Sequence, residues 1–116
     1  MRRFRITTAI ALALPLAFAA LPAASEEAYV KIVSPADGAK LDRTKPVKLA
    51  YEANPGPKGD HVHIYIDGKE VGIDRQLKGT FTLDHPAPGE HTLCVKLADK
   101  VYVPIGVGQC IKVRVD

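Results

Sequence analysis

The sequence predicts an all-β domain built as an antiparallel sandwich of about seven strands. Short segments alternate apolar and polar residues with a period of two, which is the pattern of half-buried strands. Gly and Pro separate these segments at regular intervals, and no window carries a convincing 3.6-residue apolar period. Seven short strands in about 90 residues are typical of an immunoglobulin-like or fibronectin-III-like sandwich.

The expected strands are bounded by turn residues, because Pro cannot donate to a strand ladder and Gly relaxes a turn. They are Val30–Ile32, Val47–Ala53, His61–Ile66, Lys69–Ile73, Thr80–Leu83, His91–Leu97 and Cys110–Val115. Their alternation assigns one face of each strand to the core. The residues expected to point inward are Val47, Leu49, Tyr51, Ala53, Phe81, Leu83, Leu93, Val95, Leu97, Ile111, Val113 and Val115.

The Asp67-Gly68 pair predicts a two-residue hairpin, since these residue types favour a type I′ turn whose twist matches the flanking strands. The turn sets a register in which His61 faces Asp74 and His63 faces Gly72. Four apolar residues then share the core face, and the two histidines point the other way. These four residues are Val62, Ile64, Val71 and Ile73.

Three of the expected strands become neighbours if the chain follows the usual sandwich order. They are His61–Ile66, His91–Leu97 and Cys110–Val115, with His91–Leu97 in the middle. The outward side chains of all three then lie on one surface. The sequence does not fix the register between the first two.

Residues 1–25 have the parts of a cleaved export signal. Three arginines begin the segment, residues 6–21 form an apolar run, and Ala-Ala-Ser at 23–25 fits a signal peptidase. The run is too short and too rich in small residues for a membrane span. We expect one mature domain, residues 26–116, that is periplasmic or secreted. No cysteine stands at the cleavage site for lipid attachment, so no membrane anchor is expected.

The charge balance argues against nucleic-acid binding. The chain has 16 basic and 13 acidic side chains, but three of the basic ones are the leader arginines, which leaves 13 of each. No basic stripe remains to neutralise phosphates or to hold an anionic membrane surface.

Cys94 and Cys110 point outward from adjacent expected strands. An oxidising compartment favours a disulfide between them. The alternative is a pair of thiolate metal ligands, and the two states exclude each other.

His61 and His63 form a His-x-His pair, which puts both imidazoles on one strand face about 6.5–7 Å apart. Such a pair suits copper or zinc if a further ligand approaches, and Asp74, Cys94 or His85 are the candidates. The opposing interpretation is a polar, solvated outer face. His91 is expected to be structural, with its imidazole bonded to the corner at residues 86–89.

Two further features bear on function. The mature chain has a single serine and neither a nucleophile elbow nor a Gly-rich phosphate loop, so no enzymatic activity is expected. The segment 99–108 is apolar for a hairpin connection and is expected at the same end of the sandwich as residues 54–60. It is either a partner-binding tip or an extension of the two flanking strands. The residues assigned to the tip are Val101, Tyr102, Val103, Pro104 and Ile105.

The motifs HVHIYIDG at 61–68 and PGEHTL at 88–93, followed by LAD at 97–99 and Pro104, resemble a family of small exported bacterial immunoglobulin-like domains of unknown function. That family tends to carry another histidine shortly after the position of Asp99, where this chain has Lys-Val-Tyr. A metal site shared with the family would therefore be incomplete here. The resemblance implies no activity.

The segment IVSPADGAKL at 32–41 is similar to the opening of periplasmic copper-resistance domains, which are also sandwiches. Their copper site uses a histidine at the mature N-terminus, where this chain has Glu26-Glu27. The similarity implies the fold only.

The sequence thus predicts an exported, non-enzymatic binding module without a cofactor, whose partner is an unidentified protein or small ligand. The alternative is a periplasmic copper- or zinc-binding protein that uses His61 and His63.

Overall fold

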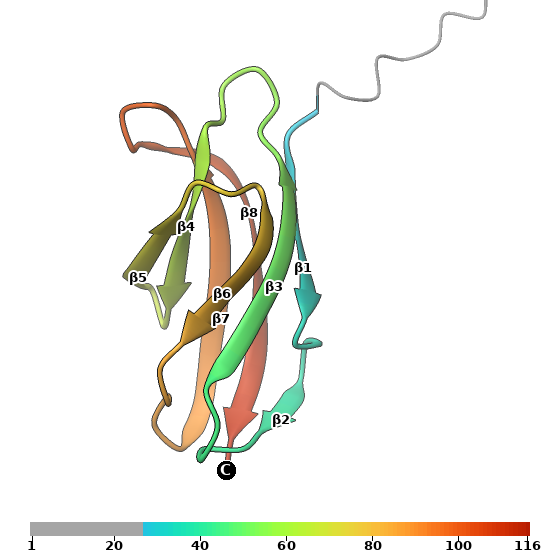
Figure 1. Cartoon of the computed structure of the whole chain (residues 1–116), viewed down its shortest axis with the longest axis vertical. Coiled ribbons are helices and arrows are strands. Elements are labelled where there is room, and N and C mark those ends of the chain that lie inside the picture. The colour runs from blue at the N-terminus through green and yellow to red at the C-terminus, as the bar shows by residue number, and fades with distance from the viewer. Residues whose placement is uncertain (1–26) are drawn as a thin grey trace, which may run out of the picture.

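The computed structural model describes residues 27–116 (Figure 1). The expected export signal at 1–25 lies outside these residues. Within 27–116 the regular structure is eight strands. They are β1 (Tyr29–Ser34), β2 (Ala39–Leu41), β3 (Val47–Asn54), β4 (His61–Ile66), β5 (Lys69–Asp74), β6 (Lys78–Leu83), β7 (Gly89–Ala98) and β8 (Pro104–Val115).

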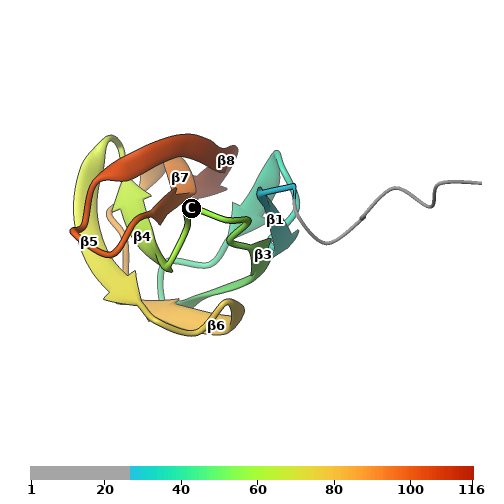
Figure 2. The same cartoon turned by 90° about the horizontal axis from the view of Figure 1, so that it is seen from above.

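The strands form two sheets that face each other across the core (Figure 2). One sheet has the order β1-β3-β6, and the other has the order β2-β8-β7-β4-β5. Strand β2 pairs with β8 in parallel, and all other pairs are antiparallel. The predicted sandwich is therefore confirmed. The three-residue β2 is an addition that the alternation pattern did not indicate.

The core lies between the sheets and is built from the alternating residues of both. Most of the residues predicted to point inward are buried, so the period-two pattern identified the core face correctly on β3, β7 and β8. The buried core residues are Ile32, Val47, Leu49, Tyr51, Val62, Ile64, Leu83, Leu93, Val95, Leu97, Ile111 and Val113.

The hairpin of β4 and β5 departs from the predicted register. Ile66 and Tyr65 pair with Lys69 and Glu70 as expected, but the register then shifts, so that Ile64 pairs with Gly72. Val71 is the extra residue of this bulge. Val71 and Ile73 are consequently 42% and 43% exposed, and their predicted place in the core is wrong.

The cause of the shift is an aromatic ring from the opposite sheet. Gly72 faces inward beside Ile64, and a Cβ on Gly72 would lie 2.1 Å from Cζ of Phe81 on β6. The Phe81 ring thus occupies the inward space that the unshifted register would give to Val71. Only a residue without a side chain fits opposite Ile64, and the hairpin bulges to place Gly72 there.

The predicted order of three neighbouring strands is confirmed, with β7 between β4 and β8. Tyr65 lies opposite Cys94, and Cys94 lies opposite Cys110, so one row crosses all three strands. The two sulfur atoms are joined at 2.00 Å, which agrees with the predicted disulfide. Thiolate ligation by these cysteines is thereby excluded in this structure.

The apolar segment after β7 divides into two parts. Residues from Pro104 onward belong to β8, so the expected strand extension is correct for this part. Residues 99–103 form the turn, which Asp99 holds by accepting the N–H groups of Val101 and Val103 at 2.9 and 3.0 Å. The turn lies at the same end of the sandwich as the loop between β3 and β4, as predicted (Figure 1).

His91 has the structural role that the sequence predicts. Its Nε2 lies 2.6 Å from the Ala87 carbonyl oxygen and its Nδ1 lies 2.6 Å from the Asp67 carboxylate. These bonds, led by the one to Asp67, raise the pKa of His91. Asp67 also accepts the Thr92 N–H, and this bond followed by the one to His91 lowers the pKa of Asp67.

The Asp67–His91 pair predicts a pH-dependent stability. A raised pKa of His91 stabilises the fold fully below pH 6.5, and a lowered pKa of Asp67 does so fully above pH 3.8. The contribution is lost as the pH rises through the folded-state pKa of His91, or falls through that of Asp67. We expect at most about 1 kcal/mol, because solvent screens the exposed Asp67. The difference in unfolding free energy between the wild type and Asp67→Asn should shrink as the pH rises above 6.5. Urea unfolding of both proteins below and above this pH measures it, and a difference that stays constant with pH would contradict the prediction.

Candidate functional site

The two histidines of β4 lie on the outer face of their sheet, yet neither is solvated. His61 is fully buried and His63 is 4% exposed. The turn after β7 folds over them, and the Tyr102 ring packs with its centroid 4.7 Å from that of His61 and 6.1 Å from that of His63. The expectation of a solvated polar face is therefore wrong for these two positions.

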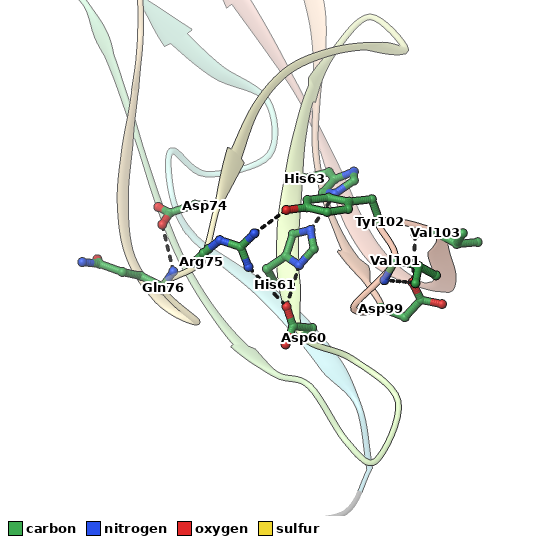
Figure 3. Close-up of polar contacts among 10 residues, drawn as sticks. All are labelled: Asp60, His61, His63, Asp74, Arg75, Gln76, Asp99, Val101, Tyr102 and Val103. Carbon is green, nitrogen blue, oxygen red and sulfur yellow. Dashed lines mark hydrogen bonds and ion pairs between the residues drawn. The ribbon is translucent and has the colours of Figure 1, made fainter.

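The histidines form the centre of a row of four side chains, which we call the Asp60–Glu70 array: Asp60, His61, His63 and Glu70. Nδ1 of His61 lies 2.9 Å from the Asp60 carboxylate, and Nδ1 of His63 lies 2.8 Å from the Glu70 carboxylate. The two Nε2 atoms face each other at 2.9 Å. Figure 3 shows this approach of the imidazoles, with Asp60 below His61.

These contacts make the four side chains one hydrogen-bonded row. An ionised carboxylate only accepts hydrogen bonds, so Asp60 and Glu70 each orient one ring through its Nδ1. This orientation turns the two Nε2 atoms toward each other.

Arg75 and Tyr102 close the array on its outer side. Nη2 of Arg75 donates to the Tyr102 hydroxyl, and Nη1 lies 3.5 Å from the Asp60 carboxylate (Figure 3). The guanidinium carbon lies 5.6 Å from the Tyr102 ring centroid. Arg75 thus links the turn after β7 to the end of β5.

The structure separates the other predicted metal ligands from the histidines. The register shift pairs Asp74 with Val62 instead of His61, and its carboxylate accepts the Gln76 N–H at 2.9 Å. His85 lies in the loop between β6 and β7, at the far end of the sandwich from the turn after β7 (Figure 1). Among residues 27–116 no group of three or more His, Cys, Asp and Glu side chains is arranged to hold a metal ion.

Sequence reasoning missed Asp60, Arg75 and the pairing of Glu70 with His63. A signal for Asp60 is present, because it directly precedes the His-x-His pair. The contact of Arg75 with Asp60 was not predicted, because the unshifted hairpin puts Asp74 beside His61. Tyr102 was assigned to a partner-binding tip, and its contact with both imidazoles depends on the fold of the turn.

The turn after β7 also presents an apolar tip, formed by Val101, Tyr102 and Val103, whose side chains are 73%, 47% and 52% exposed. Beside it an open depression of about 470 Å³ lies between this turn and the loop from β3 to β4. Its lining residues are Pro57, Lys58, Gly59, Asp99, Lys100, Val101 and Ile105. In the part of the chain that the structure describes, no helix has the length and apolarity to cross a membrane.

Solved structures with the same architecture include three from bacterial proteins. The fibronectin(III)-like modules of Clostridium thermocellum CbhA match with a TM-score of 0.65 and 19% identity, over 78% of this chain and 47% of that one. Bacteroides ovatus SGBP-B, solved with a mixed-linkage heptasaccharide, matches with a TM-score of 0.51 and 16% identity over 75% and 24%. The extracellular domain of a one-component system of B. thetaiotaomicron has the same score and identity, over 76% and 15%. The chain thus spans half or less of each of these structures, and the likeness shows the fold.

No curated protein matches the sequence. The family model for the C-terminal region of penicillin-binding proteins matches residues 19–99, which is most of the chain up to the end of β7. The match supports the predicted membership of a small bacterial immunoglobulin-like family. The chain belongs to the Penicillin-Binding Protein C-terminus family.

Proposed function

We propose that the protein is an exported, non-enzymatic binding module that docks a protein partner on the apolar tip and the adjoining depression. The observation that carries the proposal is the exposure of Val101, Tyr102 and Val103 in one short turn. Contiguous exposed apolar side chains mark contact surfaces in soluble domains. The disulfide and the predicted leader support an oxidising compartment outside the cytoplasm.

The tip is presented rigidly, which favours binding. Asp99 fixes the turn by four hydrogen bonds within residues 99–103, and Arg75, which directly follows β5, donates to the Tyr102 hydroxyl. A preorganised loop loses little conformational entropy when it binds. Tyr102 itself adopts a φ of 67°, a conformation that non-glycine residues take up only when their surroundings fix it.

Photo-crosslinking in the producing bacterium tests this surface. A photoreactive amino acid is placed at Val101 or at Val103, and at Lys112 as the matched control. Lys112 is an exposed residue of β8 far from the tip. We expect one discrete heavier adduct from the two tip positions and none from Lys112. The same adducts from all three positions, or none from any, would contradict docking at the tip.

A glycan is the second candidate partner, because SGBP-B has the same fold and was solved with a heptasaccharide. The half-exposed Tyr102 ring offers an aromatic face beside the hydrogen-bond donors of Arg75. Calorimetric titration with the mixed-linkage heptasaccharide tests it. Binding that Tyr102→Ala abolishes would support the glycan, and no heat at millimolar oligosaccharide would remove it.

A further inference from the structure

We propose that the Asp60–Glu70 array is a site for one Cu(I) ion, held in linear coordination between Nε2 of His61 and Nε2 of His63. The ion would lie between the two Nε2 atoms that face each other in the structure. This role is separate from docking at the apolar tip.

The donor atoms are already directed at one point. The Nε2 atoms face each other, and both lie in a buried setting where water does not compete. Each Nδ1 is held by a carboxylate, which fixes the ring orientation and makes the opposite nitrogen a stronger donor. Protein sites that bind metals through histidine commonly have this carboxylate–imidazole arrangement.

The charge of the site selects a monovalent ion. Two carboxylates and the Arg75 guanidinium sum to one negative charge. One Cu(I) ion would bring this sum to zero. A divalent ion such as Zn(II) would leave an uncompensated positive charge in a buried site, where charges are costly.

The number of metal donors, two imidazole nitrogens, also favours Cu(I) over Zn(II). Within residues 27–116 no third His, Cys, Asp or Glu joins the pair to complete a tetrahedral set for zinc. Two metal–nitrogen bonds of about 2 Å each in a line need the Nε2 atoms about 4 Å apart. The observed 2.9 Å must therefore open by about 1 Å. Tyr102 packs on the exposed side of both rings, so the two imidazoles must separate beneath it.

Competition with a chromophoric Cu(I) chelator under anaerobic, reducing conditions tests the proposal. We expect the purified protein to take up one equivalent of Cu(I) from bicinchoninate. Glu70→Gln should weaken binding about 10- to 100-fold by removing the carboxylate behind His63. His63→Gln should lose more, because it removes a ligand. His85→Gln is the matched control and should bind as the wild type does.

A measurement on the unaltered protein covers the case in which His63→Gln fails to fold. Ag(I), a redox-inert monovalent probe, is added to protein labelled with ¹⁵N in its histidines. The Nε2 resonances of His61 and His63 should shift together, while those of His85 and His91 stay in place. Shifts at His85 or His91 alone, no uptake of Cu(I), or Zn(II) bound at His61 and His63 as tightly as Cu(I) would overturn the proposal.

Discussion

Replacing Cys94 and Cys110 with alanine together should lower the free energy of unfolding by about 3 kcal/mol. The bridge joins residues 16 apart in sequence, and its removal frees a loop of that size in the unfolded chain. A small domain has a total stability of about 5–15 kcal/mol, so the loss is a large fraction. Urea unfolding of the oxidised wild type and of the double variant measures it.

The reduced wild type is the control for this loss. Reduction breaks the bridge without removing sulfur, so it should lower the midpoint about as much as the alanine pair does. Both states should retain the apolar tip, because residues 99–103 lie outside the part of β7 and β8 next to the bridge. A loss below about 1 kcal/mol in both states would show that β7 and β8 already restrict the unfolded chain.

The parts of the fold that follow from local pattern were predictable. The alternation on β3, β7 and β8 identified the buried faces, and Asp67-Gly68 located the hairpin turn. The prediction failed at β5, where the register depends on Phe81, a residue of the opposite sheet. Turn chemistry fixes the first pairs of a hairpin, but contacts between sheets decide whether the ladder continues without a bulge.

For the site, too, the local pattern was predictable and the long-range contacts were not. The spacing of His61 and His63 correctly placed both imidazoles on one face. Their burial was not predictable, because Tyr102 covers them from a turn about 40 residues later in the chain. Whether they bind a metal remains a prediction. The prediction of Asp74 as a ligand depends on a register that the Phe81 ring prevents. One contact between the sheets, which the strand pattern does not show, therefore led to an error in the fold and then to an error in the site.

Replacing Gly72 with alanine should destabilise the protein by about 1–3 kcal/mol, although alanine usually stabilises a strand relative to glycine. The new Cβ would meet Cζ and Cε2 of Phe81 at 2.1 and 2.6 Å. These contacts are shorter than carbon atoms tolerate, so the ring or the strand must move. Val71→Ala is the matched control, because Val71 is the neighbouring residue of the same strand and is 42% exposed. It should change stability by less than about 0.5 kcal/mol.

A smaller side chain at position 81 distinguishes the contact with Phe81 from a general intolerance of β5 to substitution. In a Phe81→Leu background, Gly72→Ala should be nearly neutral, which gives a coupling of about 1–3 kcal/mol in a double-mutant cycle. The cycle is measured by urea unfolding of the four proteins. Additive losses would mean that the cost of Gly72→Ala does not arise from its contact with the Phe81 ring. In that case Phe81 would not be what sets the bulge, and the placement of Arg75 beside the Asp60–Glu70 array would need another cause.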